Sequence, residues 1–184
     1  MTKNKKLGYL AIALAAVVLL PILVVCVLNL LAWGGIFVGG WFSPDPPAPA
    51  VTYAEFPFEI VYELEGETVT VRDVYVCAFD GFGWNEGIGK HRAWRGYLKS
   101  TGEERLILLT DGDLALACAV GYPAYYMSDP KMAEEPYTPY IYYIKADDRG
   151  GTTTGISNIE ALLEEHQIKL THWQLSSPVE NTFE

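Results

Sequence analysis

The sequence predicts an α+β protein: an N-terminal transmembrane helix, then one small β-rich, mainly antiparallel domain with a single helix in its C-terminal region. Three observations predict this class. Residues 7–33 contain no charged residue. Later segments read mostly as strands, and residues 56–64 and 168–175 alternate with a period of two, which is typical of half-buried strands. Short glycine-containing turns separate these segments, and short connections favour antiparallel pairing.

The apolar segment 7–33 is long enough to cross a bilayer. As a helix it measures about 40 Å at about 1.5 Å per residue, and the hydrocarbon core requires only about 20 apolar residues. The stub 1–6 is basic, and the next positive charge is Arg72. Because positive residues stay on the cytoplasmic side, we expect a cytoplasmic stub, one span in the cell membrane and the rest of the chain outside. Ala48-Pro49-Ala50 has signal-peptidase spacing but lies far from the apolar segment, so an uncut signal anchor is the preferred interpretation.

Residues 34–50 form an interfacial and proline-rich linker in this interpretation. Four prolines fall within Ser43–Ala50. Proline-rich segments are stiff, extended spacers. The linker would hold an extracytoplasmic domain, residues 51–184, away from the bilayer.

The domain is predicted to begin with two paired strands. Residues 56–64 alternate with a period of two, Glu65-Gly66 can form a tight turn, and residues 67–79 are rich in Val, Thr and Tyr. The polar pair Arg72-Asp73 interrupts the second strand and predicts a bulge or a second turn.

The two segments after these strands, residues 80–90 and 91–99, show no clear strand pattern. Residues 80–90 contain four glycines and are predicted to be a loop. Residues 91–99 fit either a strand or a short helix.

A hairpin is predicted in the middle of the domain. Residues 106–109 are continuously apolar, Asp111-Gly112 is a strong hairpin turn, and residues 114–120 would pair back. Since neither strand shows polar alternation, we expect this hairpin to be the most buried. The segment from Tyr122-Pro123 to Pro139 is predicted to be a loop.

The C-terminal part is predicted to contain two strands and the helix. The strands are 140–145 and 168–175, with Ile168, Leu170 and His172 on one face of the second. The helix, 158–167, begins with a capping box formed by Ser157 and Glu160.

Composition excludes some functions. The formal net charge is -10, and a nucleic-acid partner requires a cationic surface, so none is expected. No nucleotide-binding, zinc-protease or hydrolase motif is present, and no cofactor is expected.

Oxygen ligands in the glycine-rich segment suggest weak calcium binding. Asp80, Asn85 and Glu86 have the chemistry that calcium prefers, but their spacing matches no known calcium loop, and an ordinary connection is the preferred interpretation. Asp80, Glu86 and His91 are also the acid–base candidates of an alternative hypothesis, an envelope-directed hydrolase. That hypothesis requires two of them to converge in a cleft.

Two groups of residues are candidates for binding. A local basic patch of Lys90, Arg92 and Arg95 could meet an anionic partner, although cross-strand pairing with glutamates is the preferred interpretation. Tyrosines are enriched at interfaces and stack on sugar rings, although core and loop packing is the preferred interpretation. The tyrosine candidates are Tyr125, Tyr126, Tyr137 and Tyr140.

The cysteines of the domain, Cys77 and Cys118, are candidates for one disulfide, because an exterior compartment permits oxidation. The alternative is two separate buried thiols.

These observations favour a single-pass membrane protein with an extracytoplasmic binding or accessory domain. The partners expected are the lipid bilayer, through residues 7–33, and a protein or an envelope polymer. A further alternative is an accessory subunit of a membrane complex whose helix makes the contact through a small-residue stripe of Gly8, Ala11, Ala15 and Ala16.

Overall fold

The computed structural model describes residues 3–130, 137–147 and 149–184. Two compact units are present. The first unit comprises Met1–Pro46 and Phe82–His91, and the second comprises Pro47–Gly81 and Arg92–Glu184. Each unit is described by itself.

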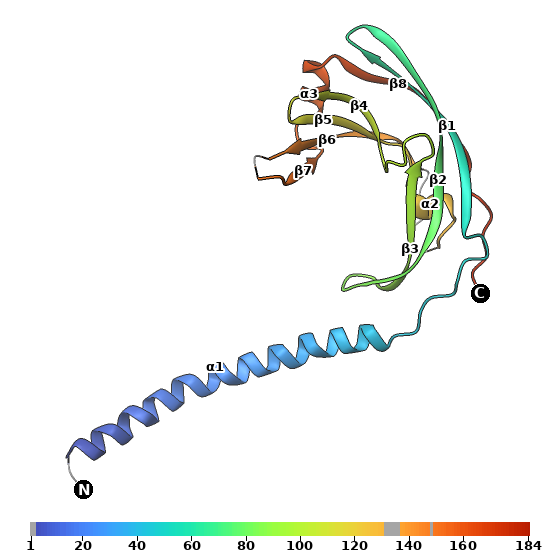
Figure 1. Cartoon of the computed structure of the whole chain (residues 1–184). Helices are drawn as coiled ribbons and strands as arrows, with labels where there is room; N and C mark the ends of the chain where they lie inside the picture. Colours follow the sequence, from blue (N-terminus) through green and yellow to red (C-terminus); the bar gives the residue numbers. More distant parts are fainter. Residues whose placement is uncertain (1–2, 131–136, 148) are drawn as a thin grey trace. The chain divides into compact units, whose positions relative to one another are not determined.

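The first unit contains a long apolar helix, α1, Lys3–Phe42 (Figure 1). Within it Ala16–Gly40 is long and apolar enough to cross a membrane. A signal sequence near the N-terminus would have the same length and composition. The helix continues to Phe42, beyond the end predicted at residue 33, because residues 34–42 include no charge and no proline to stop it. Of the small-residue stripe, only Ala16 has a described side chain.

The first sheet has the strand order β3-β2-β1-β8. Strand β1 pairs antiparallel with both β2 and β8. The predicted turn at Glu65-Gly66 is present, with φ angles of 52° and 84° that suit a tight hairpin. The strand bounds are Tyr53–Leu64 for β1, Glu67–Asn85 for β2, Gly89–Leu98 for β3 and Ile168–Leu175 for β8.

Strand β2 differs from its prediction in two ways. It pairs with β1 without a register shift at Arg72-Asp73, so the bulge predicted there is absent. Arg72 instead forms an ion pair with Glu59, its cross-strand partner. The strand also continues to Asn85, so most of the predicted glycine loop 80–90 is strand and only its tip is a turn.

The second sheet has the order β4-β5-β6-β7, and all of its pairs are antiparallel. The predicted hairpin is confirmed, but Asp111 pairs with Leu114, so the turn is Gly112-Asp113. The expectation that both strands of this hairpin are the most buried is wrong: β5 is largely buried, whereas β4 lies at the edge of the sheet and is partly exposed. Strand β7 was not predicted. The bounds are Leu106–Asp111 for β4, Leu114–Ala119 for β5, Tyr140–Ala146 for β6 and Thr152–Gly155 for β7.

Two short helices connect the strands. α2, Pro123–Tyr126, lies in a segment predicted to be a loop, of which residues 131–136 are outside the described residues. α3, Ile159–Glu165, confirms a helix in the predicted region, but it is shorter. The capping box is wrong: Asn158 is the N-cap in the left-handed region, with φ 58°, and no side chain caps the helix.

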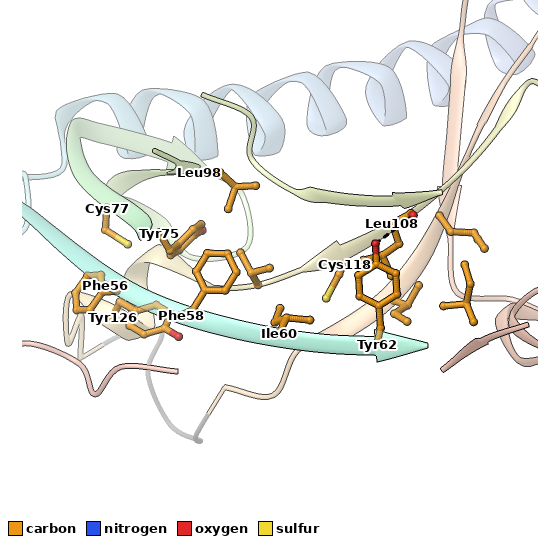
Figure 2. Packing of buried hydrophobic residues seen from close by; sticks show 14 of the residues in the cluster. Phe56, Phe58, Ile60, Tyr62, Tyr75, Cys77, Leu98, Leu108, Cys118 and Tyr126 are labelled. Carbon is orange, nitrogen blue, oxygen red and sulfur yellow. Dashed lines mark hydrogen bonds between the residues drawn. The ribbon is translucent and has the colours of Figure 1, made fainter. Parts of the chain in front are cut away.

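Side chains from both sheets form one core (Figure 2). The alternating face of β1 supplies Phe56, Phe58, Ile60 and Tyr62, all at most 6% exposed. Tyr62 Oη donates a hydrogen bond to Leu108 O at 3.5 Å and so connects the first sheet to the second.

Cys77 and Cys118 lie at separate places in this core (Figure 2) and are free thiols, so the structure has the two buried thiols of the alternative and not the candidate disulfide. Both side chains are 0% exposed. Burial raises the pKa of each thiol to about 12, because an apolar environment disfavours the thiolate. They act as small apolar core residues.

The raised thiol pKa values predict that alkali destabilises the fold. A folded-state pKa above the unfolded value of 9.0 gives stability that is complete below pH 9 and is lost as the pH rises toward about 12. The melting temperature of the full chain in detergent should therefore fall between pH 8 and pH about 10.5. The Cys77→Ala Cys118→Ala variant should show a smaller fall.

The thiol state can be read from the same samples. Iodoacetamide at pH 8 should label Cys77 and Cys118 only after unfolding in denaturant. A disulfide-linked peptide containing both cysteines would contradict the free-thiol structure.

Candidate functional site

An aromatic cleft in the second unit brings most of the predicted binding tyrosines together. Its volume is about 420 Å³, within the range of small-molecule sites. Strand β8, helix α2 and the segment after β8 supply the walls. The lining residues are Tyr125, Tyr126, Tyr137, Trp173, Gln174, Leu175, Ser176, Ser177 and Pro178.

A β-bulge directs Trp173 to the core face of β8. Tyr62 pairs with Leu170 and Val61 with His172, so Thr171 is the extra residue. Its hydroxyl donates to Val61 O at 3.0 Å. The extra residue reverses which side chains of β8 face the core beyond this point. Trp173, which pairs with Ile60, therefore lies on the inner face, where the sequence predicted His172. Because β8 is an edge strand, Trp173 remains 42% exposed.

Helix α2 forms a rigid aromatic wall. Pro123 occupies its first position, where its missing N–H is tolerated. Tyr126 is 2% exposed, and its ring centroid lies 4.6 Å from that of Phe56. Tyr125 contacts Tyr126 edge to face, with centroids 5.3 Å apart. The buried Tyr126 ring thereby holds the partly exposed Tyr125 ring in place at the cleft.

Tyr137 completes the aromatic lining of the cleft. Its hydroxyl donates to Ala119 O at 2.9 Å. Burial raises the pKa of Tyr137, and that of Tyr126 likewise, well above the ordinary tyrosine value. Both phenols therefore stay neutral to a higher pH than an exposed tyrosine would.

The segment after β8 is fastened on both sides. Ser176 Oγ donates to Pro57 O at 2.6 Å, which attaches it to the first sheet. Val179 N donates to Tyr126 O at 2.9 Å, and Ser128 Oγ donates to Val179 O at 2.6 Å, which attach it to α2. The lining contains no Asp, Glu, Lys or Arg. The cleft is thus uncharged, aromatic and bordered by serine hydroxyls.

The structure brings together three of the four predicted tyrosines, namely Tyr125, Tyr126 and Tyr137. Tyr140 is outside the cleft: it is 53% exposed, with its ring 6.0 Å from that of Tyr142. Sequence reasoning missed Trp173, because a period-two pattern cannot reveal a bulge.

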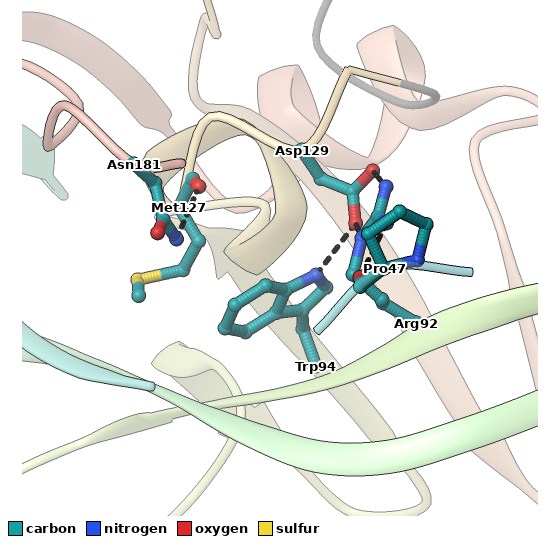
Figure 3. Close-up of polar contacts among 6 residues, drawn as sticks. All are labelled: Pro47, Arg92, Trp94, Met127, Asp129 and Asn181. Atoms are coloured by element: carbon teal, nitrogen blue, oxygen red, sulfur yellow. Dashed lines mark hydrogen bonds and ion pairs between the residues drawn. The ribbon is translucent and has the colours of Figure 1, made fainter. Parts of the chain in front are cut away.

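A buried ion pair organises the segments next to this cleft (Figure 3). Arg92 Nε and Nη2 donate to the two carboxylate oxygens of Asp129, each at 2.7 Å. Trp94 Nε1 also donates to Asp129, at 2.9 Å, and Arg92 Nη1 donates to Pro47 O at 3.0 Å. The Phe183 ring centroid lies 4.3 Å from the Arg92 guanidinium carbon. We call these five residues the Arg92 cluster.

The Arg92 cluster adjoins a backbone pairing of the linker with the C-terminus. Ala48 and Glu184 exchange hydrogen bonds at 2.9 and 3.0 Å, and Ala50 N donates to Thr182 O at 2.8 Å. Asn181 receives a hydrogen bond from Val51 N and donates to Met127 O. We call this the terminal pairing, residues 48–51 with 181–184.

The predicted basic patch is dispersed. Arg92 has only 3% of its side chain exposed and serves the core. Lys90, in the first unit, forms an ion pair with Asp45 at 2.8 Å. Arg95 is exposed and lies over the Tyr97 ring, with its guanidinium carbon 5.6 Å from the centroid.

Arg95 and Asp80 line a separate polar pocket of about 550 Å³, with Glu104 as a second carboxylate. Gly96 in its wall has to be glycine, because a Cβ there would lie 2.0 Å from Tyr75 Oη. Of the other acid–base candidates, Glu86 and His91 belong to the first unit.

The calcium hypothesis gains no support within the residues that the structure describes, where no group of three or more His, Cys, Asp or Glu could hold a metal ion. Asn85 Oδ1 instead accepts hydrogen bonds from Gly87 N and Ile88 N at 3.0 and 2.9 Å, and it shapes the turn between β2 and β3.

Comparison of the chain with protein-family models, curated proteins and solved structures found no match.

The Arg92–Asp129 pair makes a prediction about stability. Arg92→Leu or Asp129→Leu leaves one charge buried without its partner, which costs about 3–5 kcal/mol. The double variant should lose less than the sum of the two. Urea unfolding of the full chain in detergent, followed by tryptophan fluorescence, measures these differences.

The exposed Lys99–Glu55 pair, also at 2.7 Å, is the matched control. Lys99→Ala should cost about 0–1 kcal/mol, because solvent screens the pair. If Arg92→Leu cost no more than Lys99→Ala, the ion pair would not stabilise the fold.

Proposed function

We propose that this chain is a single-pass membrane protein whose extracytoplasmic domain binds neutral glycan of the cell envelope in the aromatic cleft. The apolar span Ala16–Gly40 supports membrane anchoring. Basic residues before the span, and none between it and Arg72, support a cytoplasmic N-terminus.

The lining of the cleft is the observation that carries the ligand class. A sugar ring has an apolar C–H face that stacks on aromatic rings and hydroxyls at its rim that hydrogen-bond to polar groups. Trp173 and the partly exposed Tyr125 offer an aromatic face, and Ser176 and Ser177 offer hydroxyls beside them. A charged ligand would find no opposite charge in this lining, because it contains no Asp, Glu, Lys or Arg.

Lysine labelling tests the topology. A membrane-impermeant amine reagent applied to intact cells should label Lys99 and Lys145, whose side chains are 54% and 61% exposed, and should spare the basic stub 1–6. Peptide mapping of the full-length protein reads both sites. Labelling of the stub alone would reverse the orientation, and a mature chain that lacks the span would show a cleaved signal.

Co-sedimentation of the full chain in detergent with insoluble peptidoglycan and with chitin tests the cleft. Trp173→Ala and Tyr125→Ala each remove a stacking surface and should weaken binding about tenfold, equivalent to about 1.4 kcal/mol. Tyr140→Ala is the matched control, since this exposed tyrosine lies outside the cleft, and it should bind like the unmodified chain.

Two outcomes would contradict the glycan proposal. One is binding that Trp173→Ala and Tyr140→Ala reduce equally. The other is no sedimentation with either polymer.

A further inference from the structure

The tip of the β2–β3 hairpin, residues 82–91, presents apolar side chains. Phe82 is 40% exposed and Ile88 is 44% exposed. The tip is well defined locally, because Asn85 fastens the turn and Gly89 has a φ angle of 69°, which favours glycine. It belongs to the same compact unit as α1.

The tip contacts the end of the apolar span. Gly40 is the last residue of that span. A Cβ on Gly40 would lie 2.1 Å from Trp84 Nε1, so the indole occupies the space that a side chain would need. Just beyond the helix, Lys90 Nζ and Asp45 Oδ1 are 2.8 Å apart. Two independent contacts therefore hold the tip beside the point where the span ends.

From this position we infer that the hairpin tip is a second membrane contact, seated in the interfacial layer of the bilayer; the inference rests on the proposed membrane-spanning role of α1. The end of a span lies at the boundary between acyl chains and headgroups, where Trp and other amphipathic side chains are enriched. A segment held against Gly40 by Trp84 shares that level. The occupant of its exposed apolar surface is thus lipid.

The charges of the tip set the depth of the contact. Glu86, in the turn, and Lys90, at the base, are polar residues that the hydrocarbon core would exclude. Ile88 lies between these two charges in sequence, and Phe82 lies four residues before Glu86, so both apolar side chains reach only the region near the headgroups. The tip should therefore rest in the interface without crossing it, like interfacial amphipathic segments.

Site-specific fluorescence quenching in vesicles tests the inference. The full chain would be reconstituted in phosphatidylcholine vesicles with an NBD label on Phe82→Cys or Ile88→Cys, each in a Cys26→Ser background. Buried Cys77 and Cys118 escape labelling in the folded chain. Lipids with a doxyl group near the headgroup should lower emission at both tip positions about twofold or more, and lipids with a terminal doxyl group should lower it less.

Two controls separate the possible failures. Ile156→Cys, at a residue that is 64% exposed in the second unit, should show little quenching by either lipid. A label on native Cys26, inside the span, should be quenched most by the deep doxyl group, which reports on the span itself.

Deep quenching at Cys26 with tip labels that behave like Ile156 would overturn the inference and leave the anchor intact. Loss of quenching at Cys26 would refute the anchor, and the hairpin contact with it. Gly40→Leu provides a further readout: it should displace Trp84 and reduce shallow quenching at Ile88→Cys while deep quenching at Cys26 persists.

Discussion

The buried ion pair between Arg92 and Asp129 is the interaction on which the arrangement of the second unit depends. Removing two charges from water costs several kcal/mol for each ion, and only good geometry with further hydrogen bonds offsets that cost. Here the carboxylate accepts both guanidinium donors and the Trp94 indole, while Pro47 O accepts another Arg92 proton. The pair can therefore form only when the linker, β3 and the segment after α2 are all in place. Because one ion pair needs all three segments, it both stabilises α2 and fixes its position.

The aromatic cleft combines three local departures from regular structure. A bulge at Thr171 turns Trp173 inward, and a one-turn helix starting at Pro123 places Tyr125 at the cleft over the buried Tyr126. The chain after β8 is hydrogen-bonded to α2 through Val179. None of the three would hold its position alone in water, since short helices and edge strands are marginal by themselves. They are held because each is hydrogen-bonded to the others or to the core, so the cleft is largely preformed.

Parts of this structure are predictable from the sequence, and the exceptions have physical causes. Period-two alternation locates β1, and the final strand 168–175 is predicted with its observed bounds. The strand 67–85 was cut short because its glycines read as a loop, although cross-chain pairing tolerates glycine in a strand. Trp173 was missed because a bulge leaves no mark in composition. Arg92 was assigned to the surface because the sequence does not reveal that Asp129 is its partner across the fold.

Amide hydrogen exchange of the full chain, compared between the unmodified protein and Asp129→Asn, tests the role of the Arg92 cluster most directly. The substitution keeps the shape of the side chain and removes its charge. The account predicts that the amides of Ala48, Ala50 and Glu184 in the terminal pairing lose protection together, along with Val179 over α2, while the β5–β6 amides stay protected. Unchanged protection of the terminal pairing in Asp129→Asn would contradict it.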